Sequence, residues 1–219
     1  MKQLIHSLWE ILQYIISPPL CYGCRNFLSQ RSILCYHCNA QLITIAPKLL
    51  KISSSYTLTI HAIARYGEPL KRIISAKYYS DHLMFYALAD LMWQKTIIPH
   101  LEIDYFIPVP LHWTRKMNRG FNQAEILAKR LSQHKSIPVC NNLVIRTKRT
   151  QFQASIDKLQ RKANVSHAFI VKNGFTITDK HIMLVDDLCT TGATAVEIAK
   201  VLAPYRPASI QLIVACRAL

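Results

Sequence analysis

Apolar residues occur along this chain in short continuous runs and in longer stretches with helical spacing, and the two patterns alternate. The short runs predict strands, which we place at 58–66, 104–110, 142–147, 165–171, 182–185 and 209–216. The helically spaced stretches predict helices, which we place at 68–79, 82–97, 193–202 and from 122 onward. Strands that alternate with helices in this way are typical of a mostly parallel, doubly wound sheet, so we expect an α/β fold.

The first twenty residues have an amphipathic pattern. Leu4, Leu8 and Ile11 recur at helical spacing, and Pro18 ends the predicted helix. The stretch is short for a bilayer-spanning helix, is interrupted by Glu10, and is followed by no small-residue cleavage site. We therefore expect a cytoplasmic protein that is not an integral membrane protein. The helix packs on its own domain, or it contacts a membrane surface or a partner.

These patterns divide the chain into three segments. Residues 1–45 hold the amphipathic helix and a cysteine-rich module, and residues 58–219 form the α/β domain. Between them, residues 46–57 contain three consecutive serines and have the character of a linker. The chain has 219 residues, of which 51% are hydrophobic, so it is long enough to bury a core in the α/β domain.

Four of the seven cysteines form two Cys-x-x-Cys pairs near the N-terminus. Cys21 and Cys24 are separated by ten residues from Cys35 and Cys38, which is the spacing of a structural zinc site resembling a double zinc knuckle. A redox-active pair is the alternative. We expect one zinc ion per chain with a structural role, because four cysteine ligands leave no open coordination position. The segment between the pairs is too short for a core of its own, so metal binding supplies its folding energy.

The stretch 181–196 carries the candidate chemistry. Asp186 and Asp187 stand where the predicted strand 182–185 ends, and a small polar loop follows before a helix that begins near Ala193. The amides of such a loop and the helix dipole favour a phosphate. The two carboxylates accept hydrogen bonds from vicinal hydroxyls, or they hold a divalent metal ion. The pattern therefore predicts a site for a phosphorylated, hydroxyl-bearing ligand.

A second informative loop follows the strand 104–110. It contains Arg115, Lys116 and Arg119, and it leads to a helix for which Asn122 is the predicted N-cap, with Glu125 at the capping-box position. A basic loop after a parallel strand lies on the ligand edge of an open α/β sheet, although a solvated surface loop is the plain alternative. The basic segment 148–162 is a mobile cover, a nucleic-acid contact or an exposed helix.

The charge of the chain narrows the classes of partner. Lys and Arg number 27 against 12 Asp and Glu, which gives a formal net charge of +15 and favours polyanionic partners such as nucleic acid or phosphorylated metabolites. The sequence contains neither a dinucleotide-binding glycine motif nor a nucleoside-triphosphatase phosphate loop. The sequence shows no Ser-His-Asp arrangement of a nucleophilic catalytic triad either.

Residues 182–194 resemble the phosphoribosyl pyrophosphate signature of type I phosphoribosyltransferases, with Cys189 where an aliphatic residue is usual. The whole chain is similar to the ComF family. This wider resemblance is carried by the double Cys-x-x-Cys, by PVPLH at 108–112, by RGFNQA at 119–124, and by Arg115, Arg146, Gln153, Arg161 and Asn164. It implies a type I phosphoribosyltransferase fold and a role in natural transformation by imported DNA.

The resemblance also implies roles for individual residues. Asp186 and Asp187 would be the catalytic acids and would meet the ribose hydroxyls, directly or through magnesium. The phosphate-binding loop would comprise Leu188, Cys189, Thr190, Thr191, Gly192, Ala193 and Thr194. The pyrophosphate loop would comprise Pro110, Leu111, His112, Arg115 and Arg119. The flexible loop over the site would comprise Arg146, Lys148, Arg149, Gln153 and Arg161.

Three functions compete on these grounds. The first is a competence protein that binds single-stranded or branched DNA without sequence specificity, together with a phosphoribosyl ligand and other competence or recombination proteins. The second is a nucleotide-salvage phosphoribosyltransferase, and the third is a non-catalytic adaptor that reuses the fold. The acid pair and the complete phosphate loop favour a working site over an adaptor. The positive charge and the zinc module favour the DNA role over salvage. Whether the protein is an enzyme stays open at this point.

Overall fold

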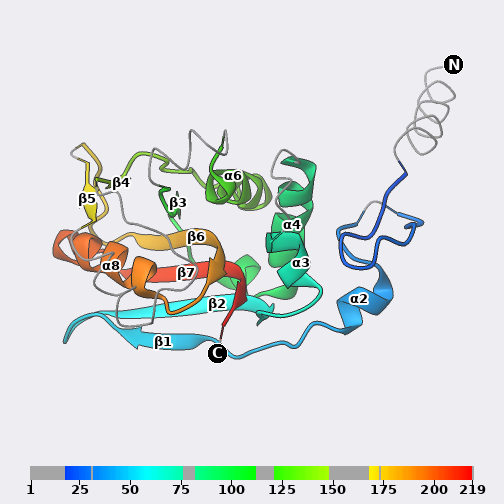
Figure 1. Ribbon diagram of the computed structural model, residues 1–219. Coiled ribbons are helices and arrows are strands. Elements are labelled where there is room, and N and C mark those ends of the chain that lie inside the picture. The colour runs from blue at the N-terminus through cyan, green and yellow to red at the C-terminus, as the bar shows by residue number, and fades with distance from the viewer. Residues whose placement is uncertain are drawn as a thin grey trace, which may run out of the picture. The chain divides into compact units, whose positions relative to one another are not determined.

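The computed structural model describes residues 18–30, 32–75, 82–111, 121–147, 168–172 and 174–218 (Figure 1). The chain forms two compact units, which we describe one at a time. The smaller unit comprises Met1–Leu42 and Gly67–Ala76, and the larger one comprises Ile43–Tyr66 and Lys77–Leu219. The amphipathic helix predicted for the first twenty residues lies almost entirely outside the described residues.

A five-stranded sheet forms the centre of the larger unit, with the strand order β1-β2-β7-β6-β3. Only β1 is antiparallel to its neighbour, and the other strands run parallel. The mostly parallel sheet predicted from the sequence is therefore confirmed. The strands span Lys48–Lys51 (β1), Thr57–Arg65 (β2), Tyr105–Pro108 (β3), His181–Cys189 (β6) and Ser209–Arg217 (β7).

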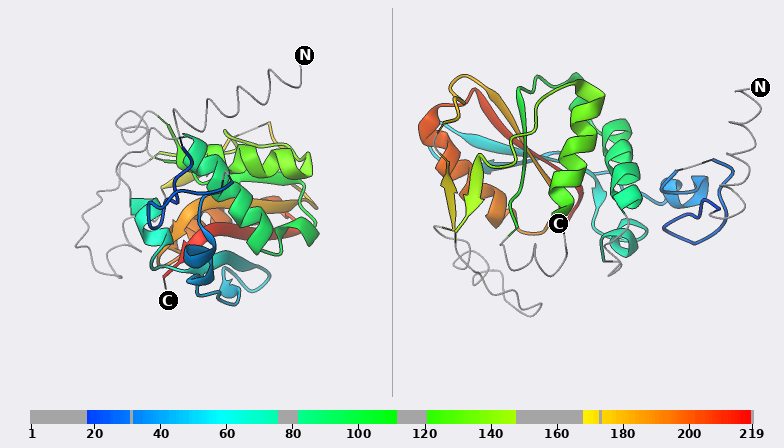
Figure 2. Two further views of the ribbon diagram at one scale, coloured as in Figure 1. Left: turned by 90° about the vertical axis from the view of Figure 1, so that its right-hand side faces the viewer. Right: turned by 90° about the horizontal axis from the view of Figure 1, so that it is seen from above.

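Helices cover both faces of this sheet (Figure 2). On one face, α4 (His82–Lys95) contacts β2 and β7, and α6 (Gln123–Lys135) contacts β3 and β6. On the other face, α8 (Ala193–Leu202) shares a core with β2, β6 and β7. Because both faces are covered, successive residues of β6 are buried, which explains why the strand is a continuous apolar run in the sequence.

A two-stranded antiparallel ribbon lies beside α8. It consists of β4 (Val144–Arg146) and β5 (Phe169–Val171), and it buries Val144 and Phe169 in the same core as α8. The larger unit also has two short 3-10 helices among its described residues, η1 (Ile98–His100) and η2 (Ala203–Tyr205). Both short strands of the ribbon fall within the strands predicted at 142–147 and 165–171.

Two expectations about the strands need correction. The expected linker 46–57 contains β1, which pairs with β2 through a turn in which the Tyr56 N–H donates to Ser53 Oγ. An edge strand of four residues with lysine at both ends leaves too short an apolar pattern to recognise. The acid pair lies inside β6 and not after its end, because β7 continues to pair with β6 as far as Cys189.

The described part of the smaller unit contains two short helices, α2 (Tyr36–Ala40) and α3 (Leu70–Ser75). α3 lies within the helix predicted at 68–79, of which residues from 76 onward fall outside the description. Arg72 of α3 donates a hydrogen bond of 2.5 Å from Nη1 to the carbonyl oxygen of Gly23. This bond joins α3 to the first cysteine pair, although the two are far apart in the sequence.

Among the described residues, no helix has both the length and the apolar character that crossing a bilayer requires.

Candidate functional site

Asp186 and Asp187 lie in the last part of β6, at the carboxyl edge of the sheet. The neighbouring strand β3 has already ended there, and the Val109 N–H donates to the Val185 carbonyl just before the acids. The Asp187 backbone N–H donates to Asp186 Oδ1 at 2.9 Å. One side of β6 is thus released from strand pairing with β3 where the two acids stand, at the carboxyl edge of the sheet.

The ionisation of Asp186 is unfavourable in this position. Removal from water, together with the adjacent negative charge of Asp187, raises the pKa of Asp186 well above its ordinary value. The positive charge of Arg146 acts in the opposite direction, so β4 brings this residue near the acid pair. A half-buried carboxylate held next to a like charge is typical of a site that meets a cation or hydroxyl donors.

The predicted phosphate loop folds into a pocket between β6 and α8. Gly192 is the N-cap of α8 and has a φ of +81°, a left-handed conformation that suits glycine. Thr191 Oγ1 accepts a hydrogen bond from the Ala193 N–H, so the turn into the helix is held from within. The pocket has about 300 Å³ of open space. It is lined by Asp186, Leu188, Cys189, Thr190, Thr191, Gly192, Ala193, Thr194, Ala195 and Leu212.

The structure thus brings Asp186 together with the whole predicted phosphate loop, 188–194, at the N-terminal end of a ten-residue helix. Loop amides and the positive end of the helix dipole favour an anion there, and the neighbouring carboxylates suit hydroxyl groups or a hard divalent cation such as magnesium. The described parts of the pyrophosphate loop, Pro110 and Leu111, directly follow β3 and therefore lie at the same edge of the sheet as the acids.

Several predicted site residues lie outside the described residues, so their positions stay predictions. These are His112, Arg115, Arg119, Lys148, Arg149, Gln153 and Arg161.

The structure does describe Asn122, which follows the basic loop and caps α6 as predicted. Asn122 Oδ1 accepts from the Ala124 N–H, and its Nδ2 donates to the carbonyl of Val109, both at 3.1 Å. Asn122 therefore ties the start of α6 to the end of β3.

Two residues of the site could not be found from the sequence. Leu212 of β7 lines the pocket. Leu50 of β1 supports the loop from behind, since a Cβ on Gly192 would lie 2.9 Å from Leu50 Cδ1. Both are ordinary apolar residues in the sequence, and only the pairing of distant strands brings them to the loop.

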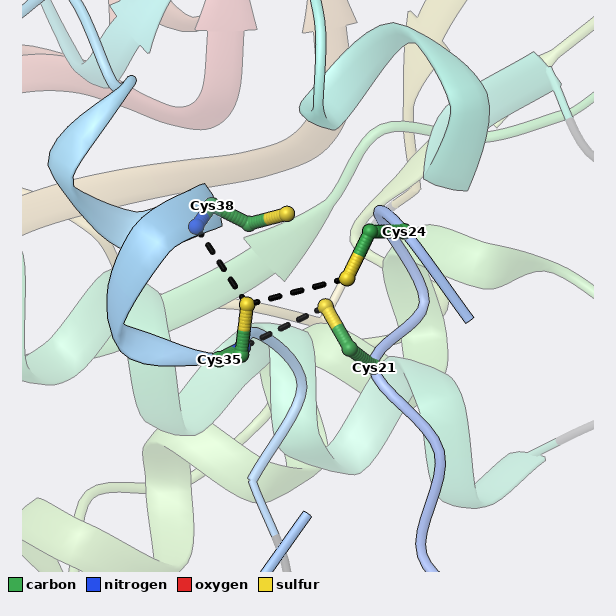
Figure 3. Close-up of side chains that lie close together, drawn as sticks. All are labelled: Cys21, Cys24, Cys35 and Cys38. Carbon is green, nitrogen blue, oxygen red and sulfur yellow. Dashed lines mark hydrogen bonds between the residues drawn. The ribbon is translucent and has the colours of Figure 1, made fainter. Parts of the chain in front are cut away.

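The second candidate site is the cluster of four cysteines in the smaller unit (Figure 3). The ligand atoms of Cys21, Cys24, Cys35 and Cys38 all lie within 4.8 Å of one another. Cys24 Sγ and Cys35 Sγ are 3.7 Å apart. A tetrahedral zinc ion with Zn–S bonds of about 2.3 Å separates its sulfur ligands by about 3.8 Å, so the spacing fits such an ion.

Backbone amides donate hydrogen bonds to two of these sulfurs. The Cys35 N–H donates to Cys21 Sγ at 3.2 Å, and the Cys38 N–H donates to Cys35 Sγ at 3.4 Å. Burial raises the pKa of Cys21, but the backbone amides that donate to its sulfur outweigh burial and bring the pKa to about 6. Burial and the three neighbouring thiols raise the pKa of Cys38. Because a bound cation favours deprotonated sulfur ligands, the four cysteines could hold a metal ion such as zinc.

Gly23 allows the two cysteine pairs to approach each other. A Cβ at this position would lie 2.9 Å from Cys38 Sγ and 2.9 Å from Pro69 Cβ. The tight turn between Cys21 and Cys24 therefore requires glycine for reasons of space.

Comparison with known proteins shows what this chain is similar to. Residues 117–219 match the family model of the phosphoribosyl transferase domain. A Haemophilus influenzae protein named Competence protein F is 33% identical over 212 residues, which cover 91% of this chain and 90% of that protein. DNA utilization protein YhgH of Shigella flexneri is 35% identical over 116 residues, which cover 53% of this chain and 50% of that protein.

Among solved structures, the hypoxanthine phosphoribosyl transferase of Trypanosoma cruzi aligns with 61% of this chain and 62% of its own, at 14% identity and a TM-score of 0.36. The match to the domain model includes β6, the acid pair, the phosphate loop and β7. Together with the sheet order it confirms the type I phosphoribosyltransferase fold predicted from the sequence.

Proposed function

The chain belongs to the ComF family of competence proteins, and from this premise we propose that it handles imported DNA in natural transformation. It does so as a cytoplasmic protein with three working parts. The pocket at 186–194 binds phosphoribosyl pyrophosphate or a related phosphoribosyl ligand with magnesium. The four cysteines hold a structural zinc ion. Basic surfaces bind DNA without sequence specificity.

The observation that carries the ligand proposal is the pocket in which Asp186 faces a loop at the start of α8. One end of the pocket suits a phosphate, because amides and the helix dipole converge there. The other end suits a polyol, because carboxylate oxygens accept hydrogen bonds from neighbouring hydroxyl groups. A ribose that carries a 5-phosphate has both groups at its two ends, which supports a phosphoribosyl ligand over a simple anion.

These residues could also carry a transfer reaction. An acceptor nucleophile attacks the anomeric carbon of the ribose, the bond to the pyrophosphate oxygen breaks, and positive charge develops on the ring. Asp186 and Asp187 hold the hydroxyl groups and stabilise this charge. A magnesium ion held by these carboxylates would supply positive charge to the departing pyrophosphate. The raised pKa of Asp186 means that the ligand or its cation must favour the ionised form before the acid can act in this way.

The ligand proposal is tested by thermal unfolding of the zinc-loaded protein. We expect phosphoribosyl pyrophosphate with magnesium to raise the melting temperature of the wild type, since a ligand that binds only the folded state stabilises it. The double variant Asp186→Ala, Asp187→Ala should lose that shift. A folded, zinc-loaded wild type with an unchanged melting temperature would overturn the proposal.

The DNA proposal rests on the formal net charge of +15 and on the family. We expect retardation of single-stranded and branched DNA in a gel, with an affinity that falls steeply as the salt concentration rises, because phosphate contacts release counterions. Absence of any salt-sensitive retardation would remove DNA from the list of partners.

A salvage phosphoribosyltransferase is the second candidate, and the match of residues 117–219 to the phosphoribosyl transferase domain favours it. It predicts release of pyrophosphate when a purine or pyrimidine base is added to the protein with phosphoribosyl pyrophosphate. The competence proposal does not require this turnover, so a coupled pyrophosphate assay separates the two functions. Binding without turnover would leave the competence role, or an adaptor that retains the ligand, as the better account.

A further inference from the structure

Arg217 is the last residue of β7, the central strand of the sheet, and it is buried, with only 8% of its surface exposed. It stands in register with Cys189 of β6 on one side and with Arg65 of β2 on the other. β7 therefore carries a guanidinium group at the sheet edge that also carries the acid pair and the phosphate loop. The buried position of this arginine could not be predicted from the sequence, because a single arginine after an apolar run usually marks the exposed end of a strand.

Among the described residues, little compensates the positive charge of Arg217. Its Nη2 donates to the carbonyl oxygen of Ala46 at 2.9 Å, while its buried Nε has no hydrogen-bond partner. No ion pair found among the described residues includes it. A buried cation without a carboxylate, and with a free N–H, is costly unless an anion completes its surroundings.

Arg217 lies beside the phosphate loop, because β7 pairs it with Cys189 of β6, a residue that lines the pocket. Burial raises the pKa of Cys189 to about 11, and the positive charges of Arg217 and Lys48 act in the opposite direction. Both cations therefore lie close enough to influence the ionisation of Cys189, which lines the pocket. Lys48 is half-buried and belongs to β1, the same strand that places Leu50 against the loop.

We propose that Arg217, supported by Lys48, is a positioning residue for the phosphate group of the ligand: it supplies positive charge beside the loop 189–192. This inference rests on the proposed phosphoribosyl site and adds a residue that no part of the phosphate-loop motif contains. The amides of the loop contact the phosphate, and the buried guanidinium strengthens their field where water cannot screen it. Its bond to Ala46 fixes the guanidinium so that this field has a constant direction.

The test compares two probes, ribose 5-phosphate and pyrophosphate with magnesium, titrated calorimetrically into the zinc-loaded protein. We expect Arg217→Gln to weaken ribose 5-phosphate binding about tenfold, because it removes a positive charge near the phosphate group, and to leave magnesium pyrophosphate within about twofold. Arg217→Lys keeps the charge and should stay within about threefold of the wild type. Arg65→Gln is the matched control, because it removes an exposed arginine from the adjacent strand and should change neither affinity.

Each outcome decides between the two levels of the proposal. A wild type that binds neither probe overturns the proposed ligand site itself. If the wild type binds and a folded Arg217→Gln binds ribose 5-phosphate equally well, the role of Arg217 is overturned while the site stands. An equal loss of both probes, or a loss in Arg217→Lys as large as in Arg217→Gln, shows a structural effect and not a charge effect. If Arg217→Gln does not fold, two other variants test the proposal. Arg217→Lys should then bind ribose 5-phosphate almost normally, and Lys48→Gln should bind it more weakly.

Discussion

At the scale of a single residue, the ionised carboxylate of Asp186 lowers the stability of the fold. The residue follows four fully buried apolar positions in β6, and its neighbour Asp187 carries the same charge. The sequence predicted both acids as ligand-binding residues from their place at the end of an apolar run. It could not predict that the strand continues through them, because backbone pairing with β7 does not depend on the polarity of the side chains.

This conflict predicts that Asp186→Asn stabilises the protein. An acid with a raised pKa in the folded state keeps a proton that the unfolded state has lost, so ionisation disfavours folding as the pH rises above the ordinary carboxyl pKa. Asparagine removes this effect and can still accept the hydrogen bond from the Asp187 N–H. We expect a higher melting temperature than the wild type at pH 7 and a gain that shrinks as the pH is lowered toward 4. A gain that grows on acidification would contradict the assignment.

Gly23 is a second residue whose role follows from space alone. We expect Gly23→Ala to weaken metal binding, because the added Cβ meets Cys38 Sγ and the rigid ring of Pro69, each at 2.9 Å. Tight packing violations of this kind cost about 1–3 kcal/mol. Competition with a chromophoric zinc chelator measures the change in affinity. Gly67→Ala is the control, since nothing lies within 4 Å of its added Cβ; equal metal affinities of the two variants would show that the approach of Gly23 to the cysteines is unimportant.

At the scale of elements, the sequence predicted the helices and strands well because each has its own local signal. The start of α6 was marked by Asn122, and α8 by the small residues that precede it. The sequence could not predict which side chains form contacts between the elements. Arg130 of α6 makes a bidentate contact with Asp90 of α4, at 2.7 and 3.1 Å, and His134 also bonds Asp90. These partners are about forty residues apart and follow no periodic pattern.

The double role of Asn122 predicts a graded loss of stability in two variants. Asn122→Ala removes both the N-cap of α6 and the bond to the Val109 carbonyl, and we expect a loss of about 2 kcal/mol in the free energy of unfolding. Asn122→Ser keeps an acceptor for the cap and loses only the bond to Val109, so about half of that loss should remain. Urea denaturation measures both. Equal losses would mean that the cap contributes little.

At the scale of the whole molecule, the chain is organised by contacts that join distant segments. Sequence patterns divide a chain at contiguous boundaries, whereas the compact unit with the cysteines also takes in Gly67–Ala76. Arg72 bonded to the Gly23 carbonyl is one reason, and no local pattern could reveal it. The candidate site has the same character: its acids and loop could be predicted from one motif, while Leu50, Leu212 and Arg217 come from strands that only the fold brings together.

The division into two units predicts separate responses to metal removal. Chelation of the metal should expose the segment 18–42 to proteolysis, because its cysteines provide the cluster and little else is buried there. The larger unit should keep its cooperative thermal transition, since its core draws on β2, β6, β7 and α8. Limited proteolysis with mass spectrometry, followed by calorimetry of the same sample, checks both. Loss of the cooperative transition together with the metal would show that the units do not fold independently.

The position of β7 has a consequence for synthesis of the protein. β7 lies between β2 and β6 in the sheet but follows both of them in the chain. A nascent chain that has not yet reached Ser209 therefore presents two unpaired parallel edges, each ready to capture a strand of another chain. The site shares this delay, because Leu212 and Arg217 arrive with the same strand. A chain truncated before Ser209 would therefore lack both the strand that joins β2 to β6 and the Leu212 side of the pocket.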